Sequence, residues 1–312
     1  MIDPELYGVY VIWRDPKNGG GFFSFLSSVL GHLKISEEMK RYPVIDGETH
    51  HLGLAENQMV LGTSNVWNYF FEPVSRYKLS DLMNLDNVIY SDGSHPDNIG
   101  FPYSKLDWIR PCFQKFIRFR KETYNFIESS SRSLELGSKT LAVHFRAGVD
   151  MRTMPNHPIP PTRKQIVKSI DLALGTNDYS TIFLACDVED EVNYLKRRYG
   201  IRLQCLNAHR EIRNGDDWHF LEGPRKYQRG LEVLADSYLL SRCGGLIAGY
   251  SGVSQFAEIM RDSENSYYTN LIWNGLLSGN ERVAKYQFRI KSILPNHLGG
   301  FKTNNSSSGV TT

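Results

Sequence analysis

The sequence predicts an α/β protein made of two Rossmann-like domains that face a cleft. Three observations support this fold class. Short apolar runs typical of buried parallel strands alternate with helical patterns in both halves of the 312 residues. A glycine-rich loop follows the first apolar run, and polar residues follow several apolar runs of the second half. The serine-rich segment Ser129–Ser138 is the expected domain boundary. The predicted domains are residues 1–138 and 139–302, and residues 303–312 form a polar tail expected to be disordered.

The first half opens with an expected βα unit. Tyr7–Trp13 is predicted to be a strand, Arg14–Gly21 a loop with three consecutive glycines, and Phe22–Met39 a helix. Consecutive glycines allow a backbone to approach a ligand closely, and the helix N-terminus that follows favours an anion. The loop is neither G-x-G-x-x-G nor a P-loop, so a plain tight turn is an equal interpretation. A second strand is expected at Arg41–Asp46.

The remainder of the first half contains an aromatic segment and a basic helical pattern. The aromatic rings of Leu61–Pro73 could form either a platform for sugar rings or part of the hydrophobic core. Ser80–Tyr90 predicts a short helix and a strand, and Asp92–Pro102 a loop. Interleaved apolar and basic residues predict one long helical region over Leu106–Ser133, with its lysines and arginines facing solvent.

The second half alternates more strictly. Strands are expected at Leu141–Phe145, Thr181–Ala185, Ile201–Leu206 and Gly245–Ala248. Helices are expected at Thr162–Leu174, Glu189–Tyr199, Gly230–Cys243 and Phe256–Met260. This alternation predicts a parallel sheet with helices on both faces.

Composition argues against several classes of function. The net charge of +2 gives no indication of a nucleic-acid partner or of a strongly basic membrane-surface protein. The four cysteines are scattered, which argues against a disulfide framework or a zinc site. No stretch approaches the roughly 20 apolar residues of a transmembrane segment, and the N-terminus does not resemble a signal peptide. We therefore expect a cytoplasmic protein.

Polar side chains gather where the strands of the second half end. They are His144 and Arg146, Asp187, and Ser251 and Ser254, with Asp236 in the helix before the last strand. Ligands of open α/β sheets bind beyond the carboxyl ends of the strands. An arginine, hydroxyl groups and a helix N-terminus suit a diphosphate, and aspartates suit a base or ribose. The competing interpretation is a structural ion pair between Arg146 and Asp150 beside an interior histidine.

Four segments resemble those of the α1,6-, α1,2- and protein O-fucosyltransferases. The segment LAVHFRAGVD (141–150) resembles their H-x-R-x-x-D motif, and TIFLACDVED (181–190) resembles their second motif, a strand that ends in aspartate. The segment DSYLLSRCGGLIAGYSGVSQFAEIM (236–260) resembles their third motif, a helix, a strand and a serine-bearing turn. GGGFFSFLSSVLGHL (19–33) resembles the loop and helix that open their acceptor domain.

The resemblance implies a GT-B-like fold, GDP-fucose as donor, inversion at the anomeric carbon and no metal or other cofactor. By position, Arg146 is implied to grip the β-phosphate, His144 and Asp236 to bind the guanine nucleoside, and Ser251 with its turn to hold the diphosphate. The N-terminal domain is implied to be the acceptor side. The residues implied to close over the diphosphate from that domain are Gly19, Gly20 and Gly21.

The first motif departs from the family pattern. Ala147 stands at a position that is usually basic, and an extra residue places Asp150 four positions after Arg146. Arg152 is a candidate for the missing charge. Arg146 and Asp150 are nevertheless the predicted catalytic residues.

Two further assignments stay open at this point. Inversion needs a base near the acceptor hydroxyl, for which Asp150, His157 and Glu72 are candidates; an ordinary loop histidine is the favoured interpretation of His157. Asp187 and Glu189 could form a D-x-D metal motif, but the family's second motif is the favoured interpretation.

We therefore expect an inverting, metal-independent glycosyltransferase. It is expected to transfer fucose from GDP-fucose to a hydroxyl of an oligosaccharide or glycolipid in polysaccharide biosynthesis. One alternative is a transferase of the same fold with another nucleotide sugar. Another is a nucleotide-sugar-binding protein without catalysis.

Overall fold

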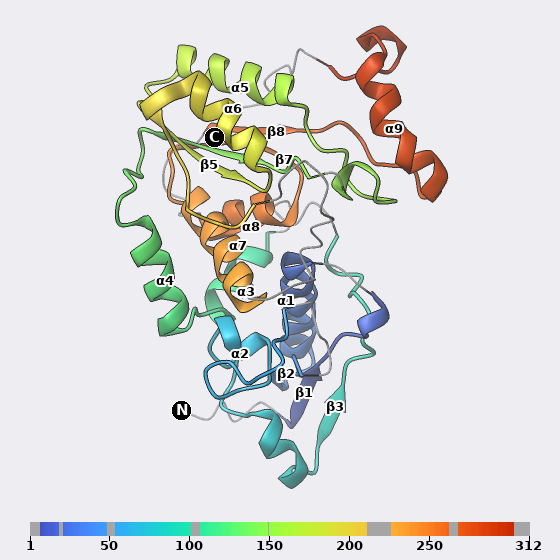
Figure 1. Ribbon diagram of the computed structural model, residues 1–312. Helices are drawn as coiled ribbons and strands as arrows, with labels where there is room; N and C mark the ends of the chain where they lie inside the picture. The colour runs from blue at the N-terminus through green and yellow to red at the C-terminus, as the bar shows by residue number, and fades with distance from the viewer. Residues whose placement is uncertain are drawn as a thin grey trace. The chain divides into compact units, whose positions relative to one another are not determined.

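A computed structural model (Figure 1) describes residues 7–18, 21–48, 54–100, 107–148, 150–210, 226–261 and 268–302. The chain divides into two compact units. The N-terminal unit is Met1–Ser129 with His219–Ala235, and the C-terminal unit is Ser130–Trp218 with Asp236–Thr312. The tail predicted to be disordered, 303–312, lies outside the described residues.

The division into units is not contiguous along the chain, whereas the sequence predicted a single boundary after Ser138. The reason is the start of helix α7 (Lys226–Leu240), which packs within the N-terminal unit. The Tyr227 ring lies 5.5 Å from the Phe70 ring, and the Tyr227 N–H donates to Glu56 Oε1 at 2.8 Å. Gly230 lies so close to Phe70 that a Cβ there would be 2.3 Å from Phe70 Cζ.

The N-terminal unit is built on a parallel sheet of order β2-β1-β3. Its strands are β1 (Val9–Ile12), β2 (Tyr42–Ile45) and β3 (Val88–Tyr90). Its helices include α1 (Phe22–Glu38), α2 (Trp67–Phe70), α3 (Ile109–Phe116) and most of α4 (Lys121–Ser131). The predicted opening βα unit is confirmed by β1 and α1.

The long helix predicted over Leu106–Ser133 is wrong, because α3 and α4 are separate helices. The chain between them is extended and forms an antiparallel bridge between Phe119 and Phe71. The Arg120 N–H donates to Phe70 O at 3.0 Å, and the Glu72 N–H donates to Arg118 O at 2.9 Å. These contacts with a segment distant in sequence override the local helical pattern.

The C-terminal unit contains a parallel sheet of order β6-β5-β4-β7-β8. Its strands are β4 (Thr140–Phe145), β5 (Thr181–Cys186), β6 (Leu203–Gln204), β7 (Gly245–Gly249) and β8 (Tyr268–Ile272). Its helices include α5 (Arg163–Thr176), α6 (Glu189–Tyr199), the second part of α7, α8 (Gly252–Met260) and α9 (Glu281–Ile293). Strand β8 and helix α9 were not predicted from the sequence.

Helices α5 and α6 cover one face of this sheet, and α8 lies against the other (Figure 1). Alternate residues of β4 and β5 form a buried core with α5 and α6: Leu141, Val143, Phe145, Ile182, Leu184, Ile166, Ile170, Val192 and Leu195. Because side chains alternate between the two faces of a strand, the intervening residues of β4 and β5 face α8.

The helices of the described ranges include none with the length and apolar character of a transmembrane segment.

Candidate functional site

The order of the C-terminal sheet marks one position for a ligand. Strands β4 and β7 are neighbours, but the chain winds outward from β4 through β5 to β6 and from β7 to β8. This reversal of strand order creates a crevice beyond the carboxyl ends of β4 and β7. His144 and Arg146 come from the end of β4, and Ser251 follows β7.

His144 and Ser251 are in contact at this crevice. His144 lies between Ala185 and Ala248 in the sheet, whose small side chains leave room for the imidazole ring. Its Nδ1 lies 3.2 Å from Ser251 Oγ. Burial, and then the charge of Arg146, lower the pKa of His144 to about 3, so the ring is neutral at pH 7.

Ser251 and Ser254 form the N-terminal cap of α8. Ser251 Oγ accepts from the Ser254 N–H at 3.3 Å, and the Ser251 N–H donates to Ser254 Oγ at 3.2 Å. The Ser254 hydroxyl donates to Gly249 O at 2.8 Å. The hydrogen bond between Ser251 Oγ and His144 Nδ1 couples the hydroxyl to the tautomer of the neutral ring: where the hydroxyl donates, Nε2 carries the proton and is an N–H donor. The Ser254 hydroxyl is thus used in capping α8 and is not free to bind a diphosphate.

Arg146 is a half-buried cation at the same strand end. Within the described residues it makes no ion pair or hydrogen bond, and its Nε is buried without a partner. A buried donor of this kind is costly unless a ligand completes it. Asp150, the other predicted catalytic residue and the partner of Arg146 in the competing interpretation, begins the 3₁₀ turn Asp150–Arg152, but its side chain lies outside the described residues.

Asp187 fixes the loop that follows Arg146. Its Oδ1 accepts from the Ala147 N–H at 2.7 Å and its Oδ2 from the Gly148 N–H at 3.3 Å. Asp187 was predicted to bind a base or ribose, but both of its carboxylate oxygens already accept hydrogen bonds from backbone N–H groups. The structure therefore favours a positioning role for this carboxylate.

Arg210 was not among the residues predicted from the sequence. Its guanidinium donates to Cys186 O and Leu206 O, and it pairs with Glu189 at 3.4 Å. Arg210 therefore ties the chain after β6 to the end of β5.

Within the described ranges no three His, Cys, Asp or Glu side chains form a group that could hold a metal ion. Asp187 and Glu189, the alternative D-x-D pair, have backbone groups and Arg210 as partners.

Two other residues that were predicted to bind the donor lie in a helix or at the start of one. Asp236 is half-exposed in α7, and the hydroxyl of its neighbour Ser237 donates to Val253 O at 2.9 Å, which holds this turn against α8. Gly21 precedes α1, and its carbonyl accepts from the Ser24 N–H at 3.0 Å. Gly19 and Gly20 lie outside the described residues.

The candidate bases differ in their surroundings. His157, in the C-terminal unit, donates from Nδ1 to Pro158 O at 2.9 Å, which leaves Nε2 as the acceptor. Its pKa is lowered, mainly by burial and further by the charge of Arg146. Glu72, in the N-terminal unit, is exposed. Arg152, the candidate for the missing charge, lies over the Phe288 ring of α9 at 4.9 Å.

The aromatic segment 61–73 belongs largely to the core. The rings of Trp67, Tyr69, Phe70 and Phe71 are at most 2% exposed. They therefore do not form an open platform for a sugar. Trp67 does reach one wall of a neighbouring pocket.

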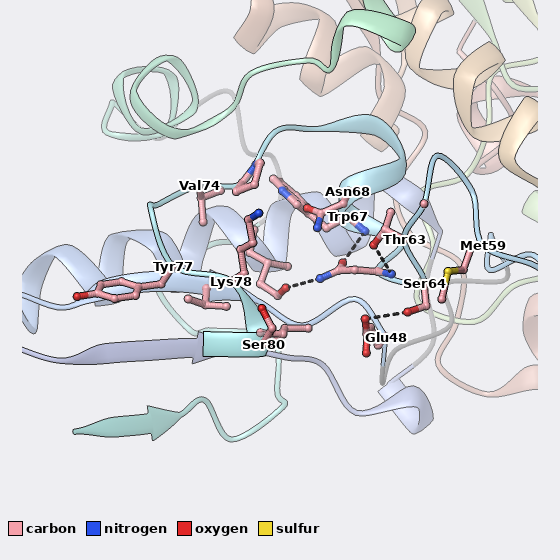
Figure 2. Close-up of a pocket in the computed structure, with 16 residues that line it drawn as sticks. Glu48, Met59, Thr63, Ser64, Trp67, Asn68, Val74, Tyr77, Lys78 and Ser80 are labelled. Carbon is pink, nitrogen blue, oxygen red and sulfur yellow. Dashed lines mark hydrogen bonds between the residues drawn. The ribbon is translucent and has the colours of Figure 1, made fainter. Parts of the chain in front are cut away.

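This pocket lies in the N-terminal unit and has a volume of about 350 Å³ (Figure 2). Figure 2 shows that Glu48, Ser64, Asn68 and Lys78 also line it. The Ser64 hydroxyl donates to Glu48 Oε1 at 2.8 Å, and no ion pair to Lys78 is present among the described side chains. A cavity of this size with an aromatic wall and a few polar groups suits a small polar ligand.

Solved structures provide the comparison with known proteins. Over 82% of this chain and 94% of the other, the fold matches the fucosyltransferase NodZ from Bradyrhizobium, with 15% sequence identity and a TM-score of 0.54. A crystal of NodZ α-1,6-fucosyltransferase grown with GDP gives the same identity and TM-score over 82% and 93% of the two chains. No protein-family model matches the sequence, and no curated protein matches it. At this identity the likeness is one of fold, and it confirms the predicted GT-B-like α/β class with two Rossmann-like units.

Proposed function

We propose that this chain transfers fucose from GDP-fucose to a hydroxyl of a glycan, with inversion and without a metal ion. The observation that carries the proposal is Arg146, a half-buried cation with no partner among the described residues, at the switch point of a Rossmann-type sheet. The neutral His144 and the capped start of α8 flank it. NodZ, whose fold this chain shares, is a fucosyltransferase that has been crystallised with GDP.

The chemistry asked of Arg146 follows from the bond that breaks. As the bond between the anomeric carbon and the phosphate oxygen lengthens, negative charge grows on the leaving GDP. A fixed guanidinium stabilises that charge more in the transition state than in the ground state. His144, in the tautomer that carries its proton on Nε2, and the N–H groups at the start of α8 would hold the diphosphate or nucleoside beside it. Asp187 would keep the loop that follows Arg146 in place through its hydrogen bonds to the Ala147 and Gly148 N–H groups.

The acceptor belongs, in this proposal, to the N-terminal unit. The pocket beside Trp67 would bind one sugar ring, with Asn68 and Lys78 as donors to its hydroxyls. The base that removes the proton of the attacking hydroxyl would be Asp150, His157 or Glu72. We further propose that the enzyme works in the cytoplasm, on an oligosaccharide or glycolipid destined for a polysaccharide. Binding of a nucleotide sugar without turnover is the alternative that Ala147 favours, because the first motif then lacks a charge at that position.

The test is GDP release from GDP-fucose in the presence of a panel of oligosaccharide and glycolipid acceptors. We expect turnover that survives EDTA, and a decrease of about 10²–10³ in kcat for Arg146→Ala. Arg202→Ala, at an exposed arginine of the same unit, is the matched control and should retain full activity. Turnover that is unchanged in Arg146→Ala, or that is lost in EDTA and restored by Mn²⁺, would contradict the proposal.

A further inference from the structure

Helix α9 carries an apolar stripe that the described part of the chain does not cover. Val283, Tyr286, Ile290 and Ile293 are 53%, 53%, 54% and 80% exposed. Their spacing of three, four and three residues aligns them on one side of the helix. Single exposed apolar residues are ordinary, but a continuous stripe marks an interaction surface. The stripe is roughly 15 Å long, at 1.5 Å per residue.

The opposite side of α9 anchors the helix and fixes the direction of the stripe. Ala284 is fully buried in a cluster with Ile159 and Leu277, and Phe288 packs on the same cluster. Gln287 Oε1 accepts from the Ser278 N–H at 2.7 Å, and its Nε2 donates to Leu276 O at 3.1 Å. Figure 1 shows α9 (red) beside the five-stranded sheet rather than on either of its faces. The stripe is therefore held outward by the fold.

A row of cations runs alongside the stripe. At 100° per residue, Arg282, Lys285 and Arg289 lie between the stripe and the anchored side. All three are exposed, and among the described residues none pairs with a carboxylate. The only acidic residue of α9 is Glu281, at its first position. This helix is amphipathic and basic although the net charge of the chain is only +2.

The positive surface continues into a groove beside α9. The groove has a volume of about 630 Å³ and is lined by Phe288 together with Arg152, Lys164 and Lys168. Its two carboxylates already have basic partners. Glu191 binds Arg163 at 2.5 Å, and Asp171 binds Arg198 at 2.6 Å. Basic side chains outnumber acidic ones among the residues that line the groove.

We propose that α9 docks this chain on the surface of a lipid bilayer that contains anionic lipids. The stripe would enter the boundary between head groups and acyl chains, and the flanking lysine and arginines would bind lipid phosphates. Charge complementarity selects this occupant over a second copy of the chain. An antiparallel two-fold interface along the stripe would place both rows of cations on the same edge, which is unfavourable. The proposal does not depend on which nucleotide sugar the chain uses.

The test is co-sedimentation of the full chain with vesicles of phosphatidylcholine alone or mixed with phosphatidylglycerol. We expect binding to the anionic vesicles that weakens as salt is added. Lys285→Gln with Arg289→Gln should weaken it roughly fivefold for each charge removed. Ile290→Asn with Ile293→Asn should weaken it roughly tenfold or more. Leu172→Asn, at a residue that is 50% exposed on α5, and Lys196→Gln, at an exposed lysine of α6, are the controls and should bind like the parent chain.

Three results would overturn the proposal. The first is no preference for anionic vesicles. The second is equal loss in the α9 variants and in the controls. The third is a dimer in sedimentation velocity without lipid that Ile290→Asn dissociates, which would assign the stripe to a second copy. Circular dichroism melts of each variant check the fold, and the substituted side chains are exposed.

Discussion

At the scale of single residues, the site depends on a contrast between two neighbours. Arg146 is charged and lacks a partner among the described residues, whereas His144 is buried, neutral and hydrogen-bonded to Ser251. The arginine and the burial both disfavour a proton on the histidine. The pair therefore presents one fixed positive charge and one neutral imidazole ring to a ligand.

This contrast predicts a pH dependence of stability. The folded-state pKa of His144 is about 3, below its usual 6.5, so between these values the unfolded chain binds a proton that the folded chain does not. The free energy of unfolding therefore falls as the pH falls, by about 2 kcal/mol between pH 7 and pH 5 from this group. Urea unfolding at both pH values should show a loss about 2 kcal/mol larger in the parent chain than in His144→Asn, because His157 and the other histidines with lowered pKa contribute equally to both. His297→Asn, at an exposed histidine, should behave like the parent. Equal pH dependence in all three would refute the assignment.

The sequence predicted the types of these residues better than their roles. The H-x-R spacing on a strand put His144 and Arg146 together, because side chains at i and i+2 share a face. Asp187 was predicted as a ligand, but its carboxylate holds the Ala147 and Gly148 amides. Strand-end position alone does not reveal which backbone groups a loop turns toward a carboxylate.

Asp187→Asn separates the two roles of this residue. An amide nitrogen would face a backbone N–H, so we expect a loss of about 1–3 kcal/mol in the free energy of unfolding together with weaker GDP binding. A residue that only bound ribose would lose GDP affinity without loss of stability. Chemical denaturation and calorimetry on the same variant distinguish these outcomes, and Asp190→Asn, exposed on α6, is the control.

At the scale of elements, the start of α8 depends on how β7 ends. Gly249 lies against Pro161, and a Cβ at Gly249 would be 2.5 Å from the proline Cδ. The ring cannot move aside, so the turn that carries Ser251 requires glycine at this position. The predicted helix began at Phe256, but the cap formed by Ser251 and Ser254 starts it at Gly252. Ser251 can be recognised as an N-cap in the sequence only if Gly252, which follows it, is assigned to the helix.

Gly249→Ala should lower the free energy of unfolding by about 1–3 kcal/mol through overpacking. Gly175→Ala is the matched control, because a Cβ in that turn of α5 meets no atom within 4 Å. It should raise stability by about 0.5–1 kcal/mol through helix propensity. Thermal unfolding of both variants measures the difference. The same sign of change in both would show that the contact with Pro161 has no consequence.

At the scale of the whole molecule, alternation of strands and helices was sufficient to predict the C-terminal sheet and its parallel direction. It did not predict β8 and α9, because their patterns follow the last recognised motif and α9 shows apolar residues on two sides. The first part of α7 joins the N-terminal unit through Tyr227 and Gly230, a contact with no local signal. Net charge also concealed the basic side of α9, since acidic residues elsewhere balance it.

The most direct test of the central claim is calorimetric titration of the purified chain with GDP, GDP-fucose, GDP-mannose and UDP-glucose. We predict micromolar binding of GDP and GDP-fucose, weak binding of UDP-glucose, and loss of binding in Arg146→Ala. Arg146→Lys should restore little, because an ammonium keeps the charge but not the two-pronged donor geometry. Arg202→Ala should bind like the parent chain. Absence of GDP binding, or binding that survives Arg146→Ala, would mean that the arginine at the end of β4 has a structural role and that the proposed donor site is wrong.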